Sequence, residues 1–104
     1  MTVAPAAHAA SENYIQITNN GWFVANTCFT WRDAEQRNYC NNARPIGNSW
    51  KAYFPAEATG AIVDLSIWPG YTAKASAAIT ETGKNHCFEI SGTALNPTLL
   101  ETGC

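Results

Sequence analysis

The sequence predicts an all-β fold, an antiparallel β-sandwich of about six or seven strands held by two disulfides. Short runs of alternating apolar and polar residues recur with turn residues between them, which is typical of strands. The chain has 104 residues, of which 46% are hydrophobic and only 13% charged, so it can form one core and is not a disordered chain. Four cysteines complete the pattern. A small β-barrel is the second interpretation.

The cysteines predict an oxidising compartment. None lies in a CxxC pair, and neither histidine has zinc-finger spacing from a cysteine pair, so disulfides are favoured over a zinc site. Of the possible pairings we favour the two with short loops, each worth roughly 3 kcal/mol in the chain-entropy model. These pairs are Cys28 with Cys40 and Cys87 with Cys104.

The N-terminus supports export. Residues 1–12 are rich in Ala and include Ala7-His8-Ala9, which resembles the end of a secretory signal peptide. We expect these residues to be a disordered tail or signal-peptide remnant, and residues 13–104 to form a single domain. No stretch approaches the ~20 apolar residues of a membrane span. The protein is therefore predicted to be secreted or periplasmic.

A long strand over residues 22–31 is expected to organise the sheet, because this run is rich in aromatic and β-branched residues. Asn20-Gly21 separates it from an alternating run over residues 14–18, and this dipeptide typically forms a two-residue hairpin turn. We therefore predict that the two strands pair in antiparallel fashion. The expected core face of the long strand carries Phe23, Ala25, Thr27, Phe29 and Trp31, and its outer face carries Trp22, Asn26 and Cys28.

The remaining strands follow from the same alternation and cover residues 49–54, 61–68, 71–80 and 86–91. Residues 32–48 break the pattern and predict a long connection with one helical turn, held by Cys40. The alanines of residues 73–81 also suit a helix, but Thr72, Ser76 and Thr80 alternate and favour a strand. In residues 92–104 we expect three leucines to anchor the tail. The expected inward residues are Trp50, Ala52, Phe54, Val63, Leu65, Ile67, Phe88 and Ile90, and the expected anchors are Leu95, Leu99 and Leu100.

Catalytic groups are sparse, and we predict that the protein is not an enzyme. His86 stands next to a cysteine expected to be oxidised, and we interpret it as an exposed turn residue. An enzyme using Asp64 or Glu89 as acid or base would need two carboxylates within about 10 Å across a cleft. Calcium binding by Asp33 and Glu35 with nearby asparagines lacks any fixed spacing. No cofactor or metal is expected.

Exposed aromatic residues indicate binding. Twelve aromatic residues are too many for so small a core, and Trp68 and Tyr71 flank the Pro69-Gly70 turn where burial is hardest. Such rings beside amides and carboxylates suit the C–H face of a sugar or a protein surface. The predicted function is a secreted, lectin-like module for a glycan or protein ligand. The predicted binding residues are Trp68, Tyr71, Trp22, Tyr53, Asp64 and Asn26.

Two other functions remain open. Tryptophan and tyrosine at loop tips also suit a lipid interface, so a membrane-active, toxin-like protein is the main alternative. A self-assembling coat protein is another, since a β-rich domain has edge strands. The net charge of −2 gives no attraction to nucleic acid or anionic lipid but permits recognition of a neutral headgroup.

Overall fold

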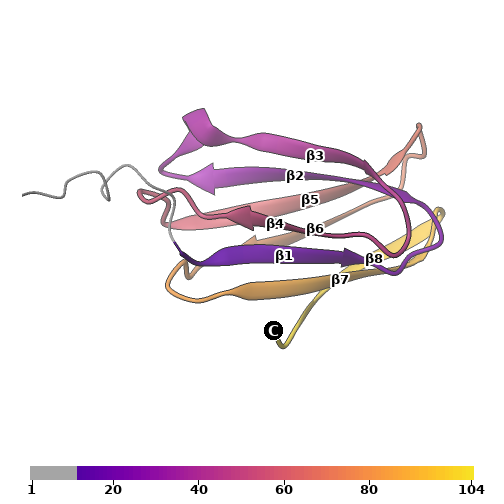
Figure 1. The fold of residues 1–104 in the computed structure, drawn as a ribbon. Helices are drawn as coiled ribbons and strands as arrows, with labels where there is room; N and C mark the ends of the chain where they lie inside the picture. Colours follow the sequence, from indigo (N-terminus) through magenta and orange to yellow (C-terminus); the bar gives the residue numbers. More distant parts are fainter. Residues whose placement is uncertain (1–11) are drawn as a thin grey trace, which may run out of the picture.

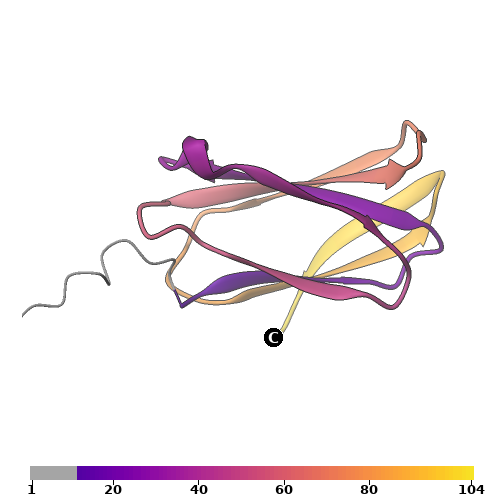
Figure 2. The ribbon, with the colours of Figure 1, turned by 45° about the horizontal axis from the view of Figure 1, so that its top comes forward.

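The computed structural model describes residues 12–104, which form two four-stranded sheets packed face to face (Figures 1 and 2). The strand orders are β4–β1–β7–β8 and β3–β2–β5–β6. This confirms the β-sandwich, with eight strands rather than six or seven. The elements are β1 (Tyr14–Asn19), β2 (Val24–Arg32), the 3-10 turn η2 (Glu35–Arg37), β3 (Tyr39–Arg44), β4 (Ser49–Tyr53), β5 (Gly60–Trp68), β6 (Lys74–Ile79), β7 (His86–Thr93) and β8 (Asn96–Thr102).

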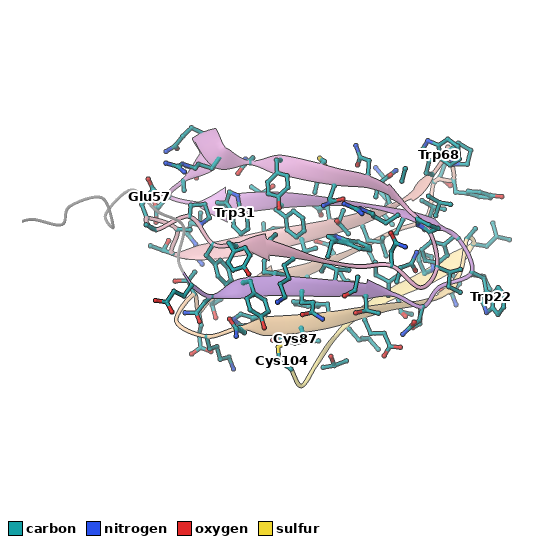
Figure 3. All side chains as sticks on the ribbon, viewed as in Figure 1. Trp22, Trp31, Glu57, Trp68, Cys87 and Cys104 are labelled. Atoms are coloured by element: carbon teal, nitrogen blue, oxygen red, sulfur yellow. A yellow bond between two sulfur atoms is a disulfide. The ribbon has the colours of Figure 1, made fainter. Side chains whose placement is uncertain are left out.

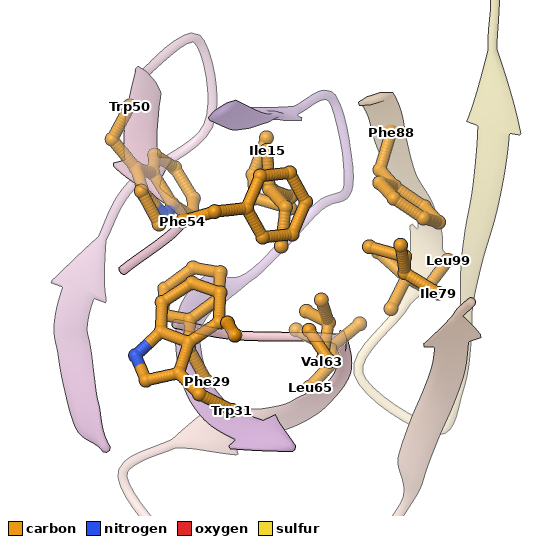
Figure 4. Close-up of a cluster of buried hydrophobic side chains, with 14 of the residues drawn as sticks. Ile15, Phe29, Trp31, Trp50, Phe54, Val63, Leu65, Ile79, Phe88 and Leu99 are labelled. Carbon is orange, nitrogen blue, oxygen red and sulfur yellow. The ribbon is translucent and has the colours of Figure 1, made fainter. Parts of the chain in front are cut away.

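The core lies between the sheets and is built from inward-facing residues of every strand except β3 (Figure 4). Trp31 stacks on Phe29 with ring centroids 5.8 Å apart and meets Phe54 edge-on at 5.7 Å. Its indole N–H donates to the Arg37 carbonyl, which ties the η2 turn to the core. The expected inward faces of residues 23–31, 49–54, 61–68 and 86–91 are confirmed, apart from Phe23, which is only partly buried.

Both disulfides form as favoured. Cys28 and Cys40 lie opposite each other on β2 and β3, on the outer face of their sheet. Cys87, at the start of β7, is joined to Cys104, so the residues that follow β8 are held against β7. The strand favoured over a helix within residues 71–80 is also confirmed, as β6.

The predicted hairpin between residues 14–18 and 22–31 is wrong. β1 pairs with β4 and, in parallel, with β7, whereas β2 pairs with β3 and β5 in the other sheet. The Asn20-Gly21 connection therefore crosses from one sheet to the other. The physical reason is Asn19, whose fully buried side chain bonds Gly21, Phe23 and Arg44 of β3 and so holds the chain toward the other sheet.

Two segments hold strands that we expected to be irregular. Residues 32–48 contain η2 and β3, an edge strand without an apolar face. Residues 96–102 form β8, in which Leu99 is buried but Leu100 is exposed, and Leu95 just before it is exposed as well. Only one of the three expected anchors therefore packs into the core.

The predicted N-terminal tail or signal remnant lies almost entirely outside the described residues. Among residues 12–104, no helix is long and apolar enough to cross a membrane.

Candidate functional site

One end of the sandwich is made of four connections that contain no Asp, Glu, Lys, Arg or His. They join β1 to β2, β3 to β4, β5 to β6 and β7 to β8. The strand registers place them together, because Val24 lies opposite Trp68, Ala25 opposite Arg44, and Trp22 beside Thr93. We call this surface the uncharged end, and it comprises residues 20–23, 45–48, 69–73 and 94–95 with the adjoining Trp68.

Large apolar side chains project from all parts of the uncharged end. Trp22 is 80% exposed and Trp68 52%, and both extend away from the ribbon at the same end of the molecule (Figure 3). The others are Ile46 at 46%, Tyr71 at 49% and Leu95 at 81%. Clustered exposure of this kind marks an interaction surface, whereas single exposed apolar residues are common.

Asn19 fixes two of these connections from inside the sandwich. Its side-chain amide donates to the carbonyl oxygens of Phe23 at 2.9 Å and Arg44 at 3.0 Å, and its Oδ1 accepts from the Gly21 N–H at 2.8 Å. Its main chain also bonds the β3–β4 connection, donating to the Asn48 carbonyl and accepting from the Gly47 N–H. One buried residue therefore sets the positions of the connections that carry Trp22 and Ile46.

Trp22 is also bound to the β7–β8 hairpin. Its N–H donates to the Gly92 carbonyl at 3.0 Å, and the nearby Asn20 N–H donates to the Ile90 carbonyl at 2.8 Å. Gly92 has φ of +94°, and a Cβ there would collide with the main chain of Asn96, so only glycine suits this tight turn. These bonds place Trp22 beside the turn that carries Leu95.

The opposite end has the reverse character. Its connections, residues 33–38, 54–59 and 80–85, with the adjoining Arg32, carry seven charged side chains, and Glu81 pairs with Lys84 at 3.5 Å. Glu57 marks this end in Figure 3, away from Trp22 and Trp68. The charged residues are Arg32, Asp33, Glu35, Arg37, Glu57, Glu81 and Lys84.

The six predicted binding residues do not form one cluster. Trp22, Trp68 and Tyr71 meet at the uncharged end, but Tyr53 ends β4 at the other end, on the outer face of its sheet. Asp64 is exposed in the middle of β5, and Asn26 accepts a hydrogen bond from the Ala43 N–H at 2.8 Å. The binding role of each residue remains a prediction.

Sequence reasoning missed Ile46 and Leu95. Leu95 was assigned to an anchored tail because the β7–β8 hairpin was not foreseen. The signal that could have found it is the pair of strand-like runs on either side of the Gly92-to-Pro97 segment. Ile46 lies between Pro45 and Gly47, which marks a turn tip.

The two carboxylates considered for acid/base chemistry are divided by the core. Asp64 projects from the outer face of one sheet and Glu89 from the outer face of the other, so they cannot share a cleft. The interpretation of His86 as an exposed turn residue is wrong. It is buried because its ring packs on Phe54 and its nitrogens bond the Glu101 carboxylate at 2.7 Å and the Glu81 carbonyl at 2.8 Å.

The acidic residues considered for calcium make local hydrogen bonds instead. Asp33 accepts from the Thr59 hydroxyl, and Glu35 accepts from the Asp33 N–H at 3.3 Å. No group of three or more His, Cys, Asp or Glu side chains within residues 12–104 is arranged to hold a metal ion.

No protein-family model and no curated protein sequence matches this chain. Several solved structures are similar to it in fold. The membrane-binding domain of pneumolysin superimposes with a TM-score of 0.59 at 13% identity, covering 88% of this chain and 96% of that domain. Listeriolysin O gives a TM-score of 0.65 at 19% identity and covers 91% of this chain. A disulfide-locked intermedilysin, solved with human CD59, gives 0.61 at 15% identity and covers 89% of this chain.

The chain spans about a quarter of the two whole proteins, 23% of the listeriolysin O chain and 24% of the intermedilysin chain. It spans nearly the whole isolated pneumolysin domain. At these identities the likeness concerns backbone arrangement alone. This chain therefore has the β-sandwich fold seen in the membrane-binding domain of pneumolysin.

Proposed function

We propose that the protein is a secreted, toxin-like module that docks on a neutral membrane through its uncharged end. The observation that carries the proposal is the gathering of exposed Trp22, Trp68, Tyr71, Ile46 and Leu95 at four connections without a charged residue. Tryptophan and tyrosine favour the membrane–water interface, and leucine and isoleucine favour the hydrocarbon just below it. The fold likeness to the pneumolysin domain supports the same function.

The charges around this end suit a neutral headgroup. The charged residues that border it in sequence are Arg44 and Lys74, both cations. Arg44 is held over the Trp50 ring at 5.7 Å and donates to Asn41, whereas Lys74 is exposed. A cation beside an apolar surface can meet a lipid phosphate, while the net charge of −2 gives no general attraction to anionic membranes.

The energy of docking comes mainly from the tryptophans. Burying half of a tryptophan side chain of roughly 200 Å² at about 25 cal/mol per Å² contributes about 2.5 kcal/mol. Removal of one such ring should lower the partition coefficient about 60-fold. Little ordering is needed on binding, because the hydrogen bonds of Asn19 hold two of the connections before any contact with lipid.

The experiment uses phosphatidylcholine vesicles brominated at defined depths in the acyl chain. Trp31 and Trp50 are buried, so contact quenching reports Trp22 and Trp68. We expect the shallowest bromine position to quench most strongly. The double variant Trp22→Ala/Trp68→Ala should lose co-sedimentation with the vesicles.

The matched control is Tyr53→Ala, which removes an aromatic ring that is 47% exposed at the far end of β4. Its vesicle binding should equal that of the unchanged protein. Absence of partition at any neutral or anionic composition, or equal loss in the control and the double variant, would refute membrane docking.

A protein surface is the second candidate ligand for the same end. The observation that favours it is the intermedilysin structure, in which a protein containing a similar sandwich is present with human CD59. Binding to cells but not to protein-free vesicles, lost in Trp22→Ala/Trp68→Ala, would favour this candidate over lipid. We propose a binding rather than a catalytic role in either case, because Asp64 and Glu89 lie on opposite faces.

A further inference from the structure

We infer that the outer face of the β4–β1–β7 sheet holds a second binding site, which takes a neutral oligosaccharide. This surface, the sheet groove, lies along the flank of the sandwich and shares no exposed apolar residue with the uncharged end. The inference stands independently of membrane docking, because none of the exposed apolar residues that carry the docking proposal takes part in it, although Asn20 borders both surfaces.

The sheet groove is a hollow of about 340 Å³ along β1 and β7, bounded on one side by Gly103 and Cys104, which follow β8. The volume is at the lower limit for small-ligand sites, about 300–1,000 Å³. The Cys87–Cys104 disulfide fixes this wall. The side chains that carry the argument are Tyr14, Gln16, Thr18, Asn20, Glu89 and Thr102.

The polar groups of the groove are held in place yet keep unused hydrogen-bonding capacity. The Glu89 Oε2 atom accepts from the Asn20 amide at 2.7 Å, and the Oε1 atom of Glu89 has no hydrogen-bond partner among the described residues. The Gln16 amide donates to the Ser49 hydroxyl at 3.4 Å, which leaves its carbonyl oxygen available. Thr18 bonds the same hydroxyl at 3.1 Å. The result is a row of fixed acceptors and donors on a sheet face.

Aromatic rings lie at one end of this row. Tyr14 and Tyr53 face each other across β1 and β4 with ring centroids 5.5 Å apart and planes at 68°. Lys51 covers one face of Tyr14, with its Nζ 4.4 Å from the ring centre, and Tyr53 remains half exposed. An exposed ring offers a stacking surface to the C–H face of a pyranose, and both tyrosine hydroxyls can bond its oxygens.

This chemistry fits a sugar better than other ligands. A carboxylate with a free oxygen can accept from two adjacent sugar hydroxyls, but it repels phosphates and therefore nucleic acid. Lys51 and Glu89 are the only charges projecting from the outer faces of β4, β1 and β7, and they balance each other, so a neutral ligand is favoured. The lining of the groove is mainly polar, which suits sugar hydroxyls better than an apolar peptide side chain.

The experiment is an NMR titration of the ¹⁵N-labelled full chain with neutral disaccharides: cellobiose, maltose, lactose and chitobiose. The amide signals of Gln16 and Asn20 should shift with at least one of these probes. For that probe, Glu89→Gln should weaken binding about tenfold or more, because the charge-assisted bonds to sugar hydroxyls are lost while the bond from Asn20 can be kept. Tyr53→Ala should also weaken it.

The matched control is Glu57→Gln, which neutralises an exposed carboxylate at the charged end of the sandwich and should leave the sugar affinity unchanged. Trp22→Ala/Trp68→Ala should also leave it unchanged, although it abolishes vesicle binding. Signals that stay fixed with every disaccharide up to about 10 mM overturn the site. The site is also overturned if the amide signals shift only on other surfaces, or if Glu89→Gln leaves the sugar affinity unaltered.

Discussion

Replacing Asn19 by aspartate should destabilise the protein strongly, although the change is nearly isosteric. The side chain is fully buried, and its amide nitrogen donates to two carbonyl oxygens, those of Phe23 and Arg44. In an aspartate at this position, an oxygen that cannot donate replaces the amide nitrogen and faces both carbonyl oxygens. Each buried carbonyl left without its donor costs about 1–3 kcal/mol, so we expect a loss of about 4 kcal/mol at neutral pH. The total free energy of unfolding of such a domain is about 5–15 kcal/mol.

The assay is urea unfolding of the Asn19→Asp variant followed by tryptophan fluorescence, with a shift of the midpoint at constant slope. The loss should shrink as the pH falls. Burial and the two facing carbonyls raise the pKa of the introduced carboxyl above its value in the unfolded chain. The native variant then binds more protons than the unfolded chain between those two pKa values, so its stability rises on acidification through that range.

Asn42→Asp is the matched control, because it adds the same charge at an exposed position of β3. It should stay within about 0.5 kcal/mol of the unchanged protein. A loss below about 1 kcal/mol in Asn19→Asp, or equal losses in the two variants, would refute the argument that Asn19 holds the connections of the uncharged end.

Three further changes test other features. Gly92→Ala should cost at least about 2 kcal/mol in unfolding free energy, because φ is +94° and the Cβ meets main chain, whereas Gly83→Ala, in open space, should be nearly neutral. Glu101→Ala removes the hydrogen-bond partner of buried His86, so it should lower the melting temperature and cost roughly 1–2 kcal/mol of unfolding free energy. Glu101→Gln, which keeps an acceptor oxygen, should largely restore this stability. Desolvation raises the pKa of Tyr39 above that of the unfolded chain, so the stability of the unchanged protein should fall as the pH rises through about 10 and above. In urea unfolding at alkaline pH, Tyr39→Phe should remove the part of this pH dependence that is due to Tyr39.

The candidate site could be predicted only in part from the sequence. Trp68 and Tyr71 were found because Pro69-Gly70 marks a turn between two alternating runs, and a turn exposes its neighbours. Grouping them with Tyr53, Asp64 and Asn26 required knowledge of which strands are neighbours. Local sequence carries no such information, and the structure separates these residues over both faces and both ends.

The sequence by itself determined the β class, the disulfide pairs and the inward faces of four strands. Each depends on spacing within a few residues: alternation sends every second side chain to the core, and short loops favour neighbouring cysteines. β3 could not be predicted in this way, because an edge strand of mostly polar residues has no buried face and therefore no alternation of apolar and polar residues.

Only the tertiary structure decided how the strands pair. Asn20-Gly21 has the local preference of a hairpin, but the buried bonds of Asn19 and the parallel pairing of β1 with β7 send the chain into the second sheet. This crossing brings Trp22 to the connection that carries Leu95 and to the end that carries Trp68. Local propensity is worth less than several buried hydrogen bonds and a shared core, so the long-range contacts fix where the exposed aromatic residues meet.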